Sequence, residues 1–184
     1  EFYKTAKKHG IKPIIGSEVY VAARGMRDKQ QGIDDKRFHL VLLAQNNKGY
    51  KNLVKLITQA NLEGFYYKPR VDKAALRQYG EGLIALSGCL SGEIPRAIAG
   101  HNFELAQQLV QEYKDIFGPG NFYLELAHHH AMKILDDVNA KLIEYGKKFN
   151  VPLVATCDAH YIEKEDAGAQ DTLMAVQTGA RLGE

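Results

Sequence analysis

The sequence has 184 residues, 45% of them hydrophobic and 25% charged, which is typical of one globular domain. The formal net charge of +2 excludes a strongly basic overall field, so any nucleic-acid interface must rest on local patches. Two cysteines exclude a disulfide scaffold, and no apolar stretch reaches the roughly 18 residues of a membrane span. We therefore expect reduced thiols, no membrane partner and a cytoplasmic location.

The chain opens on a pattern that is typical of the middle and end of a helix, with Gly10 as a candidate C-cap. No N-cap residue precedes this helix, so we expect the chain to be cut from a longer one. Short apolar runs predict strands over residues 13–22, 38–44, 83–88, 121–127 and 151–159. Helical spacing predicts helices over 46–64, 72–79, 102–117 and 134–149, and residues 23–37 form a polar surface loop.

Strands that are apolar on both faces and alternate with helices indicate an α/β fold with a largely parallel, helix-covered sheet. In the helix at 46–64, the expected buried face consists of Tyr50, Leu53, Val54, Ile57 and Ala60 or Asn61. In a parallel sheet of this kind, catalytic and binding residues lie where the carboxyl ends of the strands meet the loops.

The last predicted strand, "VPLVATCDAHYI", ends in two polar residues that share one face. Side chains at i and i+2 of a strand point the same way, so Asp158 and His160 do so here. A carboxylate and a neutral imidazole are both ligands for zinc or manganese. A simple Asp–His hydrogen bond that closes the strand explains the pair equally well.

Other strands carry further candidate ligands. Glu18 stands in an otherwise apolar run and needs a cation or a strong donor, which a neighbouring Lys or Arg would also supply. Cys89 follows the strand at 83–88, and a lone cysteine is more often a small apolar residue than a ligand. His39 opens its strand instead of ending it, and the run His128–His130 fits an incidental surface run better than a site.

Together, these residues form a set of mixed oxygen, nitrogen and sulfur donors. The set consists of Glu18, His39, Cys89, Asp158 and His160. No nucleophile motif, phosphate loop or dinucleotide fingerprint competes with it. The pattern favours a metal site at one mouth of the sheet.

Several segments resemble a known family. They are "KHGIKPIIGSEVYVA", "FHLVLLAQNNKGYKNL", "EGFYYKPRVD", "GLIALSGCLSGEIP", "NFYLEL" and "VPLVATCDAHYI". Together they resemble the PHP (polymerase and histidinol phosphatase) domain of the bacterial replicative DNA polymerase III α subunit. The resemblance runs nearly end to end, and "YYKPRVD" and "SGCLSGEIP" are specific to the polymerase branch.

The resemblance implies a distorted (β/α)7 barrel with up to three divalent metal ions, zinc or manganese with magnesium as a further option. It implies metal ligation by Glu18, His39, Cys89, Asp158 and His160. Among these, Asp158, His160 and Glu18 are the expected catalytic ligands. For His39 and Cys89 this expectation comes from the resemblance and not from their spacing.

The chain also departs from the family pattern. The first HxH motif, the next acidic ligand and a further histidine are absent, so the barrel is expected to lack its first two strands here. "LELAHHH" stands where the family more usually has "LELQDHG", so the resemblance assigns no role to His129. We expect residues 1–162 to form the barrel and residues 163–184 to begin a helical connection towards the polymerase palm.

Two functions fit these expectations. In the first, the domain belongs to a DNA-directed DNA polymerase and supports 3′–5′ exonuclease proofreading by metal-assisted phosphodiester hydrolysis. In the second, it braces the polymerase or docks a separate exonuclease. A free-standing phosphoesterase is a third possibility that the polymerase-branch motifs disfavour.

The expected partners are DNA, the sliding clamp and an exonuclease subunit, with Lys68 and Arg70 as candidate DNA contacts. Because two strands would be missing, the segment alone is expected to be inactive and poorly stable.

Overall fold

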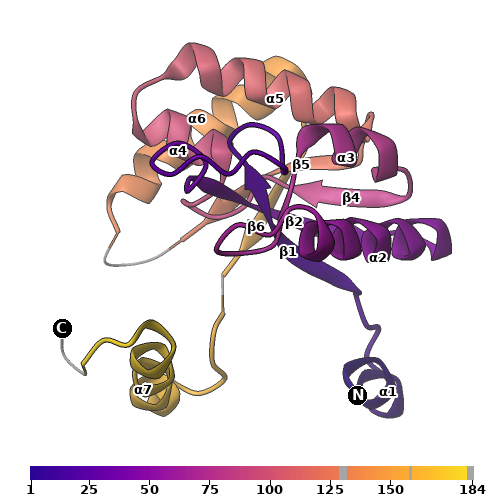
Figure 1. Ribbon diagram of the computed structural model, residues 1–184, viewed down its shortest axis with the longest axis vertical. Helices are drawn as coiled ribbons and strands as arrows, with labels where there is room; N and C mark the ends of the chain where they lie inside the picture. The colour runs from indigo at the N-terminus through magenta and orange to yellow at the C-terminus, as the bar shows by residue number, and fades with distance from the viewer. Residues whose placement is uncertain (129–131, 158, 182–184) are drawn as a thin grey trace.

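The computed structural model describes residues 1–128, 132–157 and 159–181, which form a sheet and its helices (Figure 1). The strands are β1 (Gly16–Ala22), β2 (Arg37–Ala44), β3 (Arg70–Val71), β4 (Leu83–Leu86), β5 (Phe122–Ala127) and β6 (Leu153–Thr156). The helices are α1 (Phe2–Lys8), α2 (Asn47–Leu62), α3 (Lys73–Tyr79), α4 (Glu93–Ala99), α5 (Phe103–Phe117), α6 (Ile134–Phe149) and α7 (Ala167–Thr178), with a short 3₁₀ turn η1 (Lys164–Asp166). The α/β class predicted from the sequence is confirmed.

The strands lie in the order β3-β1-β2-β4-β5-β6. β2 runs antiparallel to both of its neighbours, whereas the pairs β1–β3, β4–β5 and β5–β6 are parallel. The prediction of a largely parallel sheet is therefore wrong at β2. Residues 23–36, which join β1 to β2, contain no helix that could carry the chain across the sheet, so the chain returns beside β1 as an antiparallel partner. β3 is a strand that the sequence did not predict.

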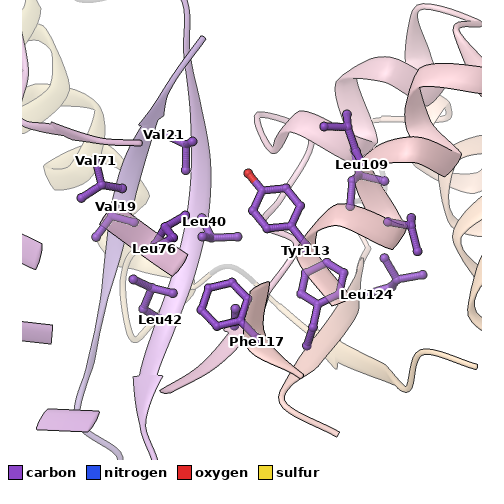
Figure 2. Close-up of a cluster of buried hydrophobic side chains, with 14 of the residues drawn as sticks. Val19, Val21, Leu40, Leu42, Val71, Leu76, Leu109, Tyr113, Phe117 and Leu124 are labelled. Atoms are coloured by element: carbon purple, nitrogen blue, oxygen red, sulfur yellow. The ribbon is translucent and has the colours of Figure 1, made fainter. Parts of the chain in front are cut away.

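The hydrophobic core lies between one face of the sheet and a layer of helices. Buried residues of β1 and β2 meet those of α5 in one cluster, and Figure 2 shows Leu40 and Leu42 on one side of it and Tyr113 and Phe117 on the other. α2 and α6 contribute Leu53, Leu56, Val138 and Leu142 to the same cluster. In Figure 1, α1 and α7 stand apart from this body.

The buried face of α2 differs from the predicted one. Tyr50 and Val54 are 51% and 45% exposed, while Leu56, which was not predicted, is fully buried. The cause is Gly49, where a Cβ would lie 1.8 Å from the carbonyl oxygen of Gly82. This close backbone contact turns the side of the helix that carries Gly49, Leu53, Leu56 and Ala60 towards the core.

The second face of the sheet carries side chains that alternate with those in the core. Register and alternation place Glu18, Tyr20, His39, Val41, Tyr123, Glu125 and Thr156 on this second face. It is the face that bears the candidate site.

The loop between β1 and β2 is organised around a buried arginine. Arg70 has 0% exposed surface, and its guanidinium donates hydrogen bonds to four carbonyl oxygens. Their donor–acceptor distances are 3.1 Å to Gly64, 2.9 Å to Asp34, 3.0 Å to Met26 and 2.8 Å to Asp28. Burial lowers the pKa of Arg70 from its ordinary value, although the group keeps its charge. A segment predicted to be an unpatterned surface loop is therefore anchored to the end of α2 and to β3.

A second contact inside this loop joins Arg24 to Asp34. Nε of Arg24 donates to Oδ1 of Asp34 at 2.9 Å and Nη2 donates to Oδ2 at 2.6 Å, and the backbone N–H of Gln30 also donates to Oδ2. Asp34 is 1% exposed. The hydrogen bond from Arg24, more than any other contact, lowers the pKa of Asp34 to about 2.

Replacing Arg70 tests the anchoring role. Arg70→Met is expected to lower the free energy of unfolding by about 3 kcal/mol or more, because four buried carbonyls lose their donor. Chemical denaturation followed by circular dichroism measures this change. Lys68→Met, at an exposed position of the same turn, serves as the control and should change stability by less than about 0.5 kcal/mol. Equal small effects of both substitutions would contradict the role given to Arg70.

The Arg24–Asp34 pair predicts an acid-sensitive contribution to stability. Because the folded-state pKa of Asp34 lies below the ordinary carboxyl value of about 3.9, its contribution is complete above that value and is lost as the pH falls towards 2. Asp34→Asn is expected to flatten the unfolding free energy between these pH values. An unchanged pH profile in this variant would show that Asp34 does not carry the dependence.

Candidate metal centre

The candidate site starts from a contact between neighbouring strands. Tyr20 of β1 lies opposite His39 of β2, and Glu18 lies opposite Val41, so the Glu18 and His39 side chains are diagonal neighbours on the second face. Oε1 of Glu18 lies 3.0 Å from Nδ1 of His39. The partner of the Glu18 carboxylate in this structure is thus an imidazole and not the Lys or Arg side chain that the sequence left open.

The direction of β2 explains why a histidine at the start of a strand joins this site. In a parallel sheet, the first residues of β2 would lie at the opposite edge from the carboxyl ends of its neighbours. Because β2 is antiparallel to β1 and β4, its first residues lie beside the last residues of both. His39 consequently lies next to the turn that follows β4.

That turn, residues 87–92, brings Cys89 to the same histidine. Sγ of Cys89 lies 3.7 Å from Nδ1 of His39, and the backbone N–H of His39 donates to the carbonyl of Ser91 at 3.1 Å. Gly88 has φ +81°, and a Cβ there would lie 2.7 Å from the carbonyl oxygen of His39. Only glycine both tolerates this conformation and permits so close an approach of the turn to β2.

One further side chain contacts the His39 ring, and a second contacts that side chain in turn. Tyr20 meets it edge-on, with ring centroids 5.2 Å apart, and the Arg37 guanidinium lies 5.2 Å from the centre of the Tyr20 ring. The contacts restrict the orientation of the imidazole, so that Nδ1 faces Glu18 and Cys89.

A cavity of about 850 Å³ adjoins the site and connects Cys89 with His160. Its lining also includes Ser91, Arg96, His128, Cys157 and Tyr161. His160 follows the end of β6, and Asp158 lies outside the described residues. Four of the five predicted ligands are thus gathered, three by direct contacts and the fourth across one cavity.

The donors are of types that bind divalent metals: a carboxylate oxygen and an imidazole nitrogen on the second face, and a sulfur on the turn after β4. The 3.7 Å separation of Sγ and Nδ1 is close to the spacing of two ligands on a tetrahedral ion, about 3.5 Å for bonds of 2.0–2.3 Å. The 3.0 Å between Glu18 and His39 is that of a hydrogen bond. Across residues 1–128, 132–157 and 159–181, no three His, Cys, Asp or Glu side chains are arranged to hold a metal ion.

The two predicted DNA contacts have different locations. Lys68 is exposed, so a contact with DNA stays a prediction for it. Arg70 is buried and donates to backbone carbonyls, so the DNA contact predicted for it is wrong. A basic residue in a proline-marked turn looks like a surface residue, and the sequence offers no signal that carbonyls surround it.

Sequence reasoning did not select His128 and Arg96, which line the cavity. The sequence predicts a surface run for the three histidines; His128 is exposed, and His129 and His130 lie outside the described residues. Arg96 is an exposed residue of α4 with its guanidinium 5.6 Å from the centre of the Phe38 ring, and helical spacing alone gives it the pattern of an ordinary surface residue.

Comparison with known proteins gives concordant matches. The family model described as PHP domain matches residues 1–129. Proteins named DNA polymerase III subunit alpha are 48% identical to the chain in Borreliella burgdorferi, over 185 residues, and 46% identical in Thermus aquaticus, over 186 residues. A third, from Aquifex aeolicus, is 47% identical over 191 residues.

Each of these alignments covers 100% of the chain but only 15–16% of the relative. The family model, in contrast, covers more than half of the chain and includes Glu18, His39 and Cys89. The chain therefore belongs to the PHP domain family.

Proposed function

We propose that this chain is the PHP domain of a bacterial replicative DNA polymerase, the α subunit of DNA polymerase III, and that it holds divalent metal ions that support 3′–5′ exonuclease proofreading. The names of the relatives, which match over the whole chain, support the assignment to this subunit. The chain spans about one sixth of the length of these relatives, and we propose that DNA synthesis belongs to other parts of such a protein.

The observation that carries the metal-site proposal is the contact of both Glu18 and Cys89 with one nitrogen of His39. A carboxylate, an imidazole and a sulfur from three separate segments meet there beside a cavity. Carboxylate oxygen, imidazole nitrogen and cysteine sulfur are the donor types with which proteins bind zinc.

In the proposed centre, Glu18, His39 and Cys89 hold metal on the β1–β2 side and His160 and Asp158 hold it on the β6 side. Zinc or manganese bound there supplies Lewis-acid stabilisation of a phosphodiester and an acidified water. Tyr20 and Arg37 keep the His39 ring in place. Arg96, which lines the cavity, is suited to bind a phosphate oxygen.

We further propose that the sheet is part of the seven-stranded PHP barrel. β3 and β6 are the two ends of the described sheet, each with one strand neighbour. Strands added at those ends would close the barrel and remove the unpaired edges. The segment that contains η1 and α7 would then lead towards the polymerase palm. DNA, the sliding clamp and an exonuclease subunit are the proposed partners, in the cytoplasm.

One observation favours a second candidate function, a domain without catalysis that braces the polymerase or docks a separate exonuclease. The Glu18–His39 distance is that of a hydrogen bond, so this pair satisfies itself without a metal. In a barrel that has lost its metals, such a pair would still stabilise the contact between β1 and β2.

Metal content separates the two candidates. The complete subunit is expected to retain two or three zinc or manganese ions per chain after gel filtration, measured by mass spectrometry of the elements. His39→Ala and Cys89→Ser should each weaken binding by more than about 100-fold, because each removes a ligand. His101→Ala, outside the cavity, is the matched control. Absence of bound metal at micromolar zinc or manganese would contradict the catalytic proposal.

Nuclease activity should follow the metal. Removal of a mismatched 3′ nucleotide by the complete subunit is expected to stop on chelation and to return with zinc or manganese, while His39→Ala stays inactive. The 184-residue chain alone is expected to be inactive, since the proposed centre also needs ligands beyond it. Activity of that chain alone would overturn the proposed division of the site.

A further inference from the structure

We infer that Glu125 is a positioning residue that couples the turn carrying Cys89 to the strand end carrying His160. This inference rests on the proposed metal centre. It concerns how the turn that carries Cys89 and the strand end that carries His160 keep a constant distance from each other. Glu125 lies on β5, the strand between β4 and β6. In the sequence it stands within the apolar run "NFYLELA", whose first six residues also belong to the segments that resemble the family.

The first coupling runs from Glu125 to the Cys89 turn through the backbone. In a regular parallel ladder, the N–H of Glu125 would donate to the carbonyl of Ser87. It donates instead to the Ser87 hydroxyl oxygen at 2.8 Å, because the Ser87 carbonyl is turned towards the start of α4, where a Cβ on Gly92 would lie 2.1 Å from it. The hydroxyl thus keeps β4 and β5 joined while the backbone leaves the sheet towards Cys89.

The second coupling runs from Glu125 to β6 through the side chain. The Thr156 hydroxyl donates to Oε1 of Glu125 at 2.6 Å, a length typical of a hydroxyl bonded to a carboxylate. Thr156 is the last residue of β6 and directly precedes Cys157, which lines the cavity together with His160. The bond therefore holds the strand at the point where the chain leaves it for the site.

The burial and placement of Glu125 suit this role. It is 7% exposed and lies on the second face of the sheet, the face that also bears Glu18 and His39. A buried carboxylate is costly, so an apolar residue would serve a purely structural strand better. Ser87, at the other end of the coupling, is 2% exposed. One buried residue thus bonds to both site-bearing segments, one through its backbone and the other through its carboxylate.

Cobalt binding to the complete subunit tests this inference, because cobalt replaces zinc and its absorption reports sulfur ligation by Cys89. Thr156→Val keeps the shape of the side chain and removes the donor, and Glu125→Gln keeps an acceptor but removes the charge. Each is expected to weaken cobalt affinity by about 10–100-fold, as does loss of other groups that orient ligands. Thr156→Ser keeps the hydroxyl and should bind as the unmodified protein does.

A matched control separates positioning from general stability. Asn52→Ala also removes one buried hydrogen bond, from Nδ2 of Asn52 to the carbonyl of Glu81, but Asn52 does not line the cavity. It should lower the melting temperature of the metal-free protein and leave cobalt affinity unchanged.

Two outcomes overturn the inference in different ways. If the unmodified protein binds cobalt and Thr156→Val and Glu125→Gln bind it equally tightly, Glu125 has no positioning role while the metal centre stands. If the unmodified protein binds no cobalt, the proposed function fails, and the inference fails with it. Loss of affinity in both variants, with retention in Thr156→Ser and Asn52→Ala, supports it.

Discussion

The antiparallel register of β1 and β2 is the constraint on which the candidate site depends. It sets His39 opposite Tyr20 and brings its Nδ1 to 3.0 Å from Glu18. A slip of one residue would turn His39 to the helix-covered face and remove every contact that it makes with the site. The long connection between the strands does not by itself impose a register, so the anchoring of that connection matters for function as well as for stability.

Arg70 provides that anchor at a distance from the chemistry. Its buried guanidinium bonds to carbonyls of Met26, Asp28 and Asp34 in the connection and to Gly64 beyond α2. A charged group in the interior is tolerated because it meets four oriented carbonyl dipoles, which offset part of its lost hydration. On the other side of β2, the glycine turn at residues 87–92 packs against His39 and presents Cys89. The loop and the turn thus hold the strand from two directions.

Much of the fold could be predicted from the sequence, whereas His39 and Cys89 entered the candidate site through the family resemblance alone. The failures of prediction have physical reasons. Apolar runs located five of the six strands, but the pattern of a buried strand is the same in both directions, so the reversal of β2 was invisible. That reversal explains why His39, at the start of its strand, lies beside the turn after β4 that carries Cys89. The environment of Arg70 arises from residues far apart in the chain, and no local pattern encodes it. The predicted buried face of α2 is wrong because the close contact between Gly49 and the backbone of Gly82, which helical spacing does not reveal, fixes the orientation of the helix.

Anomalous diffraction from crystals of the complete subunit, recorded at the zinc absorption edge, tests the central claim most directly. The account predicts an anomalous peak within bonding distance of His39 Nδ1 and Cys89 Sγ, with the Glu18 carboxylate turned onto it. A fully zinc-loaded crystal without a peak there, in which Glu18 and His39 keep their hydrogen bond, would contradict it.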